Sequence, residues 1–576
     1  MSTEKSKEDN QENEPNQQLP QPKAASGVYG LIIIQIITKL FTFLLNQLLI
    51  RFISPKIFGI ASYLEFITST ILFFSREAVR LSVQRIQAGR NDDGGTKGNQ
   101  FRIGTRSGSL QSVINFGFLA CGLGLGVLSM VGYWQYRTDM FQITFMKLSL
   151  WQYSSLLIIF SILLELIIEP VFLIYQFELD FSRRSKFEGL AIFLKCVMTF
   201  VVVVLGKSMD SESFEGIGVL AFSFGRFVYS LTLFITYSIS FLKFNQENNT
   251  DVKYSMNKIY DSKNESSFYF QNEIFKIWKE FFIQMLFKQL LTEGDKLIIN
   301  YLCTIDEQGI YAVISNYGAI IARLLFQPLE ESTRLMFTKI LNSTATTSSF
   351  DSTKQSFNYL KLISIFYFNL SIMILFAGIT NAPFLLQFII GRKWGHNTDL
   401  FDLFQIYIIY IPFLAFNGIL EALYSGMASN KDMKRFSSYM IFVSILIVCV
   451  SYLLIEKLRF GILGLIIANV INMALRIGFC FVGIKKYYSI RSVAGLSLMN
   501  VVKYTWSSTF VMVVWWGVQY LVVFGMNGYT TQSWKQLIGS GFICIGLLSN
   551  LLFLERKNLH GPLDKLKSRL TRQKLD

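Results

Sequence analysis

Histidine is nearly absent from this chain, with two residues among 576, and its six cysteines stand singly rather than in C-x-x-C pairs. Metal centres, disulfide frameworks and Ser-His-Asp triads are all built from these two residue types. We therefore expect no metal site, no disulfide scaffold, no cofactor and no enzyme of the common hydrolytic classes.

Charge is also scarce, since 16% of the residues are charged whereas an average soluble domain has about 25%. Hydrophobic residues make up 52% of the chain, and only nine prolines interrupt them. The net charge of +15 does not form a basic domain, because Lys and Arg stand in short clusters between apolar stretches. This pattern is typical of the loops of a membrane protein. The sequence predicts membrane lipids as partners and no nucleic acid.

Apolar segments long enough to cross a bilayer recur along the whole chain. A transmembrane helix needs about 20 apolar residues, and by this criterion we predict about fourteen spans. They are 27–50, 57–75, 111–133, 150–172, 188–206, 215–243, 279–302, 310–328, 359–380, 402–428, 436–456, 460–484, 502–526 and 536–555. Lys and Arg are roughly three times as frequent between the spans on the side of the N-terminus as on the other side, which places both termini in the cytosol.

A polar segment near the middle of the chain prompts a comparison of its two halves. At an offset of about 249 residues, polar residues within apolar helices coincide: Gln35 with Gln284, Lys39 with Lys288, and Asn46 with Asp295. We therefore predict an all-α polytopic fold with two pseudo-symmetric six-helix lobes around a central cavity, plus two C-terminal helices. The predicted parts are a cytosolic tail (1–26), an N-lobe (27–243), a flexible cytosolic linker (244–278), a C-lobe (279–484), helices 13 and 14 with their preceding loop (485–555), and a basic cytosolic tail (556–576).

Ionisable residues inside the predicted spans are candidate functional residues, because each costs about 3 kcal/mol in mid-membrane. The first and seventh spans carry matching polar stripes: Gln35, Lys39 and Asn46 in one, and Gln284, Lys288, Glu293, Asp295 and Lys296 in the other. Gly294 stands among the charges of the second stripe, which indicates a bend or an interruption there. The alternative is that Lys39 reaches the membrane interface and Lys288 pairs with a nearby acid.

Two further charge pairs have two interpretations each. Glu165 and Glu169 lie one helical turn apart, and they form either a cation or proton site or ion pairs with Arg or Lys of neighbouring helices. Arg76 and Arg80 lie on one face, and they form either a phosphate clamp or a simple positive-inside cluster. Further embedded charges include Glu65, Lys195, Arg226, Arg323, Glu421 and Arg476.

Several of these segments resemble the Rft family of endoplasmic-reticulum membrane proteins. The similarity is carried by RFISPKIFG at 51–59, SREAVR at 75–80, IEP at 168–170, LTEGD at 291–295 and FQPLEES at 326–332. It extends over about residues 27–555 and indicates a fungal member. That family belongs to a superfamily of multidrug exporters and flippases for oligosaccharide-lipids and polysaccharides, so the resemblance implies two six-helix lobes around a central cavity.

The resemblance also implies a function and a site. Dolichol-pyrophosphate-linked Man5GlcNAc2 would pass from the cytosolic to the lumenal leaflet of the endoplasmic reticulum membrane for N-glycosylation. The residues implied for the diphosphate are Lys39, Arg51, Lys288 and Lys296, with Arg76 and Arg80 at the cytosolic mouth. Arg323 is a further predicted substrate-binding residue. Those implied for the sugars are Gln35, Asn46, Gln284, Glu293 and Asp295.

Two other functions stay open at this point. One is a protein that binds and hands on the glycolipid without moving it, and the other is an ion-coupled antiporter of small molecules with Glu165, Glu169 or Asp295 as its coupling carboxylate. The chain has no nucleotide-binding loop, so transport would use a gradient or run downhill. We expect a monomer, with association with glycosylation enzymes left open.

Overall fold

The computed structural model describes residues 41–87, 101–178, 180–207, 211–248, 250, 252–261, 266–342, 349–391, 394, 399–428, 430–490, 498–525 and 528–556. Within these ranges a few side chains, those of Lys288 and Asp295 among them, fall outside the description. Gln35 and Lys39 also lie outside it, so the match between the two predicted polar stripes stays a prediction.

Long helices account for nearly all of the described chain. The first half contains α1, described from Phe41 to Ile50, then α2 (Pro55–Val83), α3 (Arg106–Tyr136), η1 (Met140–Phe145), α4 (Trp151–Phe177), α5 (Phe181–Gly206) and α6 (Ser211–Asn248). The second half contains α7 (Asn272–Leu302), α8 (Ile305–Ile321), η2 (Ala322–Phe326), α9 (Gln327–Asn342), α10 (Ser349–Ile390), α11 (Leu400–Met427), α12 (Asn430–Tyr452), η4 (Leu453–Lys457), α13 (Gly461–Ile490), α14 (Leu498–Val522) and α15 (Trp534–Leu554).

Each of the fourteen predicted spans overlaps one of these helices. The elements α8, η2 and α9 follow one another without a break and form one uninterrupted helical segment. Eleven helices of the described chain are long and apolar enough to cross a membrane. The predicted all-α polytopic fold is therefore confirmed. The predicted interruption at Gly294 is wrong, because α7 stays helical from Asn272 to Leu302.

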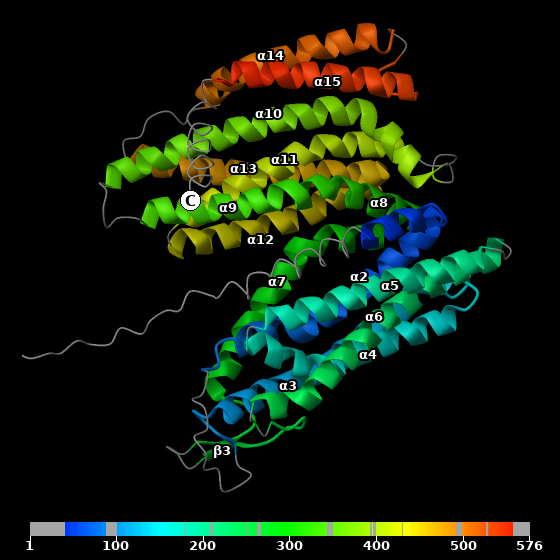
Figure 1. Ribbon diagram of the computed structural model, residues 1–576, viewed down its shortest axis with the longest axis vertical. Helices are drawn as coiled ribbons and strands as arrows, with labels where there is room; N and C mark the ends of the chain where they lie inside the picture. Colours follow the sequence, from blue (N-terminus) through cyan, green and yellow to red (C-terminus); the bar gives the residue numbers. More distant parts are fainter. Residues whose placement is uncertain are drawn as a thin grey trace, which may run out of the picture.

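The helices form two groups that meet at one end. In Figure 1, α2 to α6 lie in the lower group, α8 to α13 lie in the upper group, and α14 and α15 lie beyond α10. The largest hydrophobic core crosses between the groups, since it includes Ile57 and Ile60 of α2 together with Ile310 and Ile314 of α8. The two groups are thus joined by a shared apolar core at the start of α2 and α8.

Glycines allow the two helices to come this close. A Cβ atom added to Gly59 would lie 2.1 Å from the carbonyl oxygen of Ile305, and one added to Gly309 would lie 2.0 Å from that of Pro55. No side chain fits at such distances, so both positions require glycine. Gly59 and Gly309 are about 250 residues apart, close to the offset of the internal repeat.

The same end is held by polar contacts between the groups. Arg51 donates from Nε to the carbonyl oxygen of Ile389 at 2.6 Å and from Nη2 to that of Phe388 at 2.8 Å. Trp394, whose side chain is fully buried, donates from its indole nitrogen to the carbonyl oxygen of Ile50 at 3.0 Å. These donors satisfy carbonyl groups at helix ends, which lack intrahelical partners.

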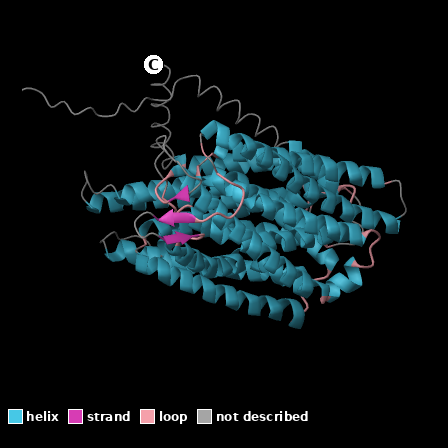
Figure 2. Ribbon diagram, turned by 90° about the horizontal axis from the view of Figure 1, so that it is seen from below, coloured by secondary structure: helices cyan, strands magenta, loops and turns pink. Residues whose placement is uncertain are grey.

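The segment predicted as a flexible linker is folded where the structure describes it. Strands β2 (Ile259–Asp261) and β3 (Ser266–Phe268) pair antiparallel, and β1 (Phe101–Arg102) pairs parallel with β2. Figure 2 shows this small sheet against the helices at one end of the molecule. The prediction of flexibility rested on a polar composition, which does not reveal partners in another part of the chain.

Those partners are two fully buried amides on α3. Asn115 donates from Nδ2 to the carbonyl oxygens of Asn257 and Tyr269 at 2.7 and 2.8 Å, and its Oδ1 accepts from the backbone N–H of Asn257. Gln111 donates to the carbonyl oxygen of Ser255 at 2.7 Å and accepts from the backbone N–H of Lys253. The linker is therefore fastened to the N-terminal group of helices.

Replacing Asn115 with alanine is expected to loosen this fastening, because each buried backbone group left without a partner costs about 1–3 kcal/mol. Amide hydrogen exchange in the 252–271 segment should accelerate by about tenfold or more, as measured by mass spectrometry. Ser129→Ala is the control, since the Ser129 hydroxyl bonds only within α3. Unchanged exchange in the Asn115 variant would contradict the role of this amide.

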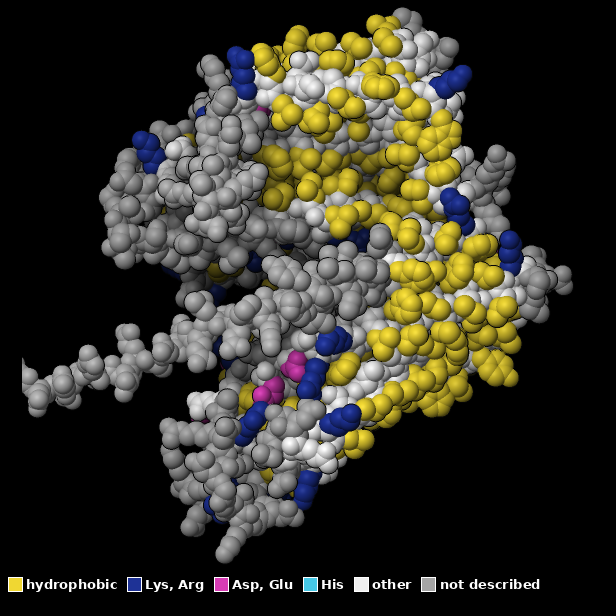
Figure 3. All heavy atoms as spheres, in the orientation of Figure 1, with side chains coloured by type: hydrophobic (Ala, Val, Ile, Leu, Met, Phe, Trp, Pro, Cys, Tyr) yellow, Lys and Arg dark blue, Asp and Glu magenta, His cyan; other side chains and the backbone are white. Residues whose placement is uncertain are grey.

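Buried hydrogen bonds also fix the last two helices to α10. Gln519 of α14 donates to the hydroxyl of Ser540 on α15 at 2.6 Å, and Asn381 of α10 donates to the same hydroxyl at 2.8 Å. The outer side of α15 is apolar and exposed, with Phe542 71% exposed, and Figure 3 shows hydrophobic side chains covering much of the outer surface. Such a surface requires lipid around it.

Candidate functional site

A cavity of about 910 Å³ lies between the two groups of helices. Its wall combines residues of α1, α2, α4, α5 and α6 with residues of α7, α8, η2 and α11. The contact of Gly59 with α8 closes the molecule at one end. Figure 3 shows the surface hollowed between the two groups on the opposite side.

The charged side chains in the cavity wall are mainly cationic. They are Lys195, Arg226, Lys296 and Arg323, with Glu65 as the single carboxylate among the described lining residues. Glu65 accepts from Lys195 and from Arg226, at 3.2 Å in each case. The wall therefore carries an excess of positive charge. The low polarizability of the surrounding protein and lipid strengthens the attraction of this charge for an anionic ligand.

Among the described residues, Arg323 is the cation of the wall that forms no ion pair with a carboxylate. Its Nη2 donates to the backbone and side-chain oxygens of Asn316 at 2.9 and 3.0 Å, and these acceptors are neutral. The residue lies in η2, a π-helical segment that precedes Pro328. Because proline cannot donate a backbone hydrogen bond, it favours a widened turn just before it. The sequence thus places in the cavity an arginine whose described partners are neutral oxygens.

Neutral polar groups in the wall are also available for a ligand. The buried Nδ2 atom of Asn300 and the buried Oε1 atom of Gln308 have no hydrogen-bond partner among the described residues. The rings of Tyr407 and Tyr410 pack edge-to-face, with centroids 5.3 Å apart. Unsatisfied buried amides are costly in a folded protein unless a ligand or water pairs with them.

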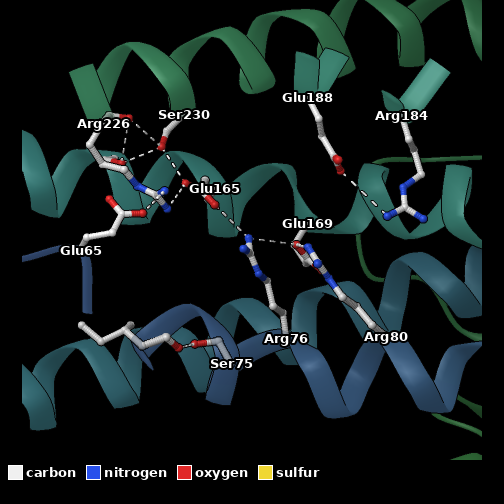
Figure 4. Close-up of polar contacts among 12 residues, drawn as sticks. Glu65, Ser75, Arg76, Arg80, Glu165, Glu169, Arg184, Glu188, Arg226 and Ser230 are labelled. Atoms are coloured by element: carbon white, nitrogen blue, oxygen red, sulfur yellow. Dashed lines mark hydrogen bonds and ion pairs between the residues drawn. The ribbon is translucent and has the colours of Figure 1, made fainter. Parts of the chain in front are cut away.

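An ion-pair cluster adjoins the cavity inside the N-terminal group, as Figure 4 shows. Arg80 donates to both oxygens of Glu169, at 2.5 and 2.7 Å, and Arg76 donates to Glu165 at 2.9 Å. Arg226 donates to the other oxygen of Glu165 at 2.6 Å. Both glutamates are almost fully buried. Of the two interpretations of Glu165 and Glu169, interhelical ion pairing is confirmed.

This cluster affects two predictions from the sequence, the phosphate clamp of Arg76 and Arg80 and the antiporter alternative. Arg76 and Arg80 are bonded to carboxylates and are not among the residues that line the cavity, so a phosphate would have to displace a buried glutamate to reach them. Glu165 and Glu169 are the coupling carboxylates of the antiporter alternative. Both are held by arginines, an arrangement that does not favour binding of a further cation.

The other predicted site residues fall into three groups. Asn46, Lys296 and Arg323 line the cavity. Arg51 lies at the closed end, Gln284 is exposed on α7, and Glu293 accepts from Lys296 at 2.7 Å. Gln35 and Lys39, and the side chains of Lys288 and Asp295, lie outside the described residues.

Sequence reasoning missed Lys195, Arg226 and Glu65 as wall residues. All three were visible as charges within predicted spans, and that signal alone would have justified including them. The neutral residues Asn300 and Gln308 gave no comparable signal, because amides are common near helix ends.

Comparison with known proteins agrees with this geometry. The family model described as Rft protein matches residues 23–565. The chain belongs to the Rft protein family. The Man(5)GlcNAc(2)-PP-dolichol translocation protein RFT1 of Candida albicans is 45% identical to this Rft protein over 96% of this chain and 97% of its own. The protein of the same name from Saccharomyces cerevisiae is 36% identical over 96% and 98%.

Solved structures support the fold of this Rft protein. The lipid II flippase MurJ in an inward closed conformation matches with a TM-score of 0.54 at 14% identity, over 92% of this chain and 100% of that one. An inward-facing multidrug transporter of the MATE family matches with a TM-score of 0.53 at 12% identity, over 79% and 96%. This Rft protein is therefore a multi-pass membrane protein that shares the fold of these two structures.

Proposed function

We propose that this chain moves Man(5)GlcNAc(2)-PP-dolichol from the cytosolic to the lumenal leaflet of the endoplasmic reticulum membrane for N-glycosylation. Its relatives are named as translocation proteins for this glycolipid. The observation that carries the proposal is the cationic wall of the central cavity, above all Arg323, which has no ion pair with a carboxylate among the described residues.

The chemistry of the glycolipid fits this cavity. A diphosphate requires cations, and a guanidinium group presents paired donors that match phosphate oxygens. Sugar hydroxyls both donate and accept, so they can satisfy the unpaired amide atoms of Asn300 and Gln308. A cavity of 910 Å³ lies near the upper end of the range for drug-sized ligands, about 300–1,000 Å³, so it suits the diphosphate and the first sugars. The polyprenyl chain stays in the bilayer.

Translocation further requires that the two lobes open alternately to the two sides of the membrane. We take 27–243 and 279–484 as the two moving lobes, with both termini in the cytosol and the Gly59–Gly309 contact on the lumenal side. The described conformation then has its cavity closed toward the lumen. Reopening requires α2 and α8 to separate at this contact.

The experiment that tests the function is reconstitution of the purified protein in liposomes with the labelled glycolipid. We expect exchange of the glycolipid between leaflets that depends on the protein. Binding without exchange would instead support a protein that hands the glycolipid to later enzymes.

Replacing Arg323 with glutamine is expected to lower the rate of exchange by about tenfold to 150-fold, because a charge-assisted hydrogen bond contributes about 1.5–3 kcal/mol. Arg323→Lys should retain part of the activity, since it keeps the charge and loses the paired donors. Lys457→Gln is the matched control, as Lys457 is an exposed cation in the π-helical segment η4. Equal exchange by the Arg323→Gln and Lys457→Gln variants would show that Arg323 does not bind the diphosphate.

A further inference from the structure

The two lobes contain charge clusters at equivalent places, and the clusters differ at one position. In the N-lobe, Arg80 of α2 pairs with Glu169 of α4, and Arg226 of α6 pairs with Glu165, one turn before Glu169 on α4. About 250 residues further along the chain, α9, α11 and α13 bring together Glu330, Glu421 and Arg476. Both clusters contain an arginine of the last helix and a glutamate of the middle helix. Where the N-lobe has Arg80, the C-lobe has a glutamate.

Glu330 consequently lacks the partner that its counterpart has. Its carboxylate lies directly against the backbone of Gly418, where an added Cβ would be 1.7 Å from Oε1. Glu421 accepts from Nη2 of Arg476 at 2.7 Å and weakly from Nδ2 of Asn417 at 3.4 Å. Within the described chain, no ion pair or hydrogen bond satisfies the Glu330 carboxylate.

Two buried polar atoms of the helices around Glu330, α10 and α11, are also without partners among the described residues. The Oδ1 atom of Asn417 accepts no hydrogen bond, although this residue is only 6% exposed. The hydroxyl of Tyr367 is unpartnered in a side chain that is fully buried, and Tyr367 lies close enough to Glu330 to interact electrostatically. In this part of the C-lobe, the acceptor Asn417 Oδ1 and the Tyr367 hydroxyl therefore remain without hydrogen bonds, and the Glu330 carboxylate has no ion pair among the described residues.

We propose that Glu330 and Glu421 form a proton-binding site in the C-lobe, in which Arg476 neutralises Glu421 and a bound proton neutralises Glu330. In the N-lobe, Arg80 performs the neutralisation, and that cluster needs no proton. Glu421 is paired with Arg476 and Glu330 is not, so ionising both neighbouring carboxylates carries a cost.

The surroundings of Glu330 support this assignment. Glu330 lies beyond the Ile305–Phe326 span, and burial, with the charge of Glu421 added, raises its pKa to about 7, while the exposed Arg334 acts to lower it. The titratable and charged groups around the site are Tyr359 and Tyr367 of α10, Glu421 of α11, Arg476 and Cys480 of α13, and Arg334 of α9. Because folding raises this pKa, the protonated form stabilises the protein at low pH, and that stabilisation is lost as pH rises through about 7.

The test uses the purified full chain in lipid nanodiscs, with infrared difference spectra recorded between about pH 5.5 and pH 8.5. The wild type should lose one protonated carboxyl band across this interval, and Glu330→Gln should lose none. Glu456→Gln is the control, because Glu456 is exposed on η4, and it should behave like the wild type. The thermal midpoint of the wild type should fall over the same interval, while that of Glu330→Gln should stay constant. A wild-type titration in the Glu330→Gln spectra would overturn the proposal.

A second variant keeps the Glu330 carboxyl group and changes only its surroundings, so that the titrating group is not simply removed. Gly418→Ala displaces the flexible carboxyl of Glu330 from its place on the backbone, so the same band should titrate at lower pH instead of disappearing. An unshifted titration in this variant contradicts the proposed position of the proton.

The use of the proton in transport rests on the proposed function and is measured separately. Exchange of the glycolipid by the wild type should change between about pH 6 and pH 8, and exchange by Glu330→Gln should not. If the spectra titrate as expected but both proteins share one pH profile, the proton is bound without a role in transport. If no exchange occurs at all, the spectra still decide whether the proton site exists.

Discussion

Replacing Glu165 with alanine is expected to destabilise the folded protein by about 3–5 kcal/mol, the usual cost of removing one partner from a buried ion pair. Glu165 is 2% exposed, and it accepts from Arg76, Arg226 and Ser230 at 2.9, 2.6 and 2.8 Å. Without it, two buried guanidinium groups lose their nearest carboxylate. Those groups keep only the longer contacts to Glu169 and Glu65.

The measurement is the fraction of protein that stays monodisperse in detergent after heating. It is obtained by size-exclusion chromatography of a fluorescent fusion of the protein. Glu188→Ala is the control, because the Glu188 carboxylate is 42% exposed and lies 3.9 Å from Arg184. Surface pairs of this kind contribute about 0–1 kcal/mol. Equal losses in the two variants would mean that the buried cluster is not important for stability.

Replacing Gly59 with valine is expected to prevent closure of the lobes at the end where α2 meets α8. The new Cβ would collide with the carbonyl oxygen of Ile305, a backbone atom that cannot rotate away. Overpacking costs about 1–3 kcal/mol, which lowers the ratio of closed to open molecules by about fivefold to 150-fold. Exchange of the glycolipid should fall accordingly, although the protein stays folded.

Spin labels at positions 207 and 457 report this change directly, because both positions are exposed and the two belong to different groups of helices. Their distance distribution should shift to longer values in the Gly59→Val protein. Gly122→Val is the matched control, since a Cβ at Gly122 meets no atom within 4 Å. An unchanged distribution in the Gly59 variant would show that closure does not depend on this glycine pair.

The sequence predicts this fold well because the membrane imposes a strong rule. Every apolar run long enough to cross it must be a helix, so the fourteen spans follow from length and hydropathy. The helix starts are also encoded locally. Ser54 caps α2 ahead of Pro55, and Thr304 forms a capping box with Glu307 at α8, about 250 residues later.

The site is less predictable because its geometry depends on contacts between distant helices. The position of Arg323 depends on a π-helical turn, and hydropathy does not report such a turn. The pairing of Arg80 with Glu169 requires knowing that α2 and α4 are neighbours. The folded linker was missed for a related reason, since Gln111 and Asn115 look like ordinary polar residues near a helix start.

The fastening of the linker has a mechanical consequence for α7. The first turns of this helix are anchored in the N-lobe, where Ile274 is part of the core and Trp278 packs against it. Its last turns, with Ile298 and Ile299, belong to the core shared with α8. Because the linker is bound to the N-lobe, it cannot lengthen when the two lobes move relative to each other. The middle of α7 must therefore bend during such a motion. That stretch includes Gln284 and Glu293, so bending of α7 changes the surroundings of these polar side chains as the lobes move.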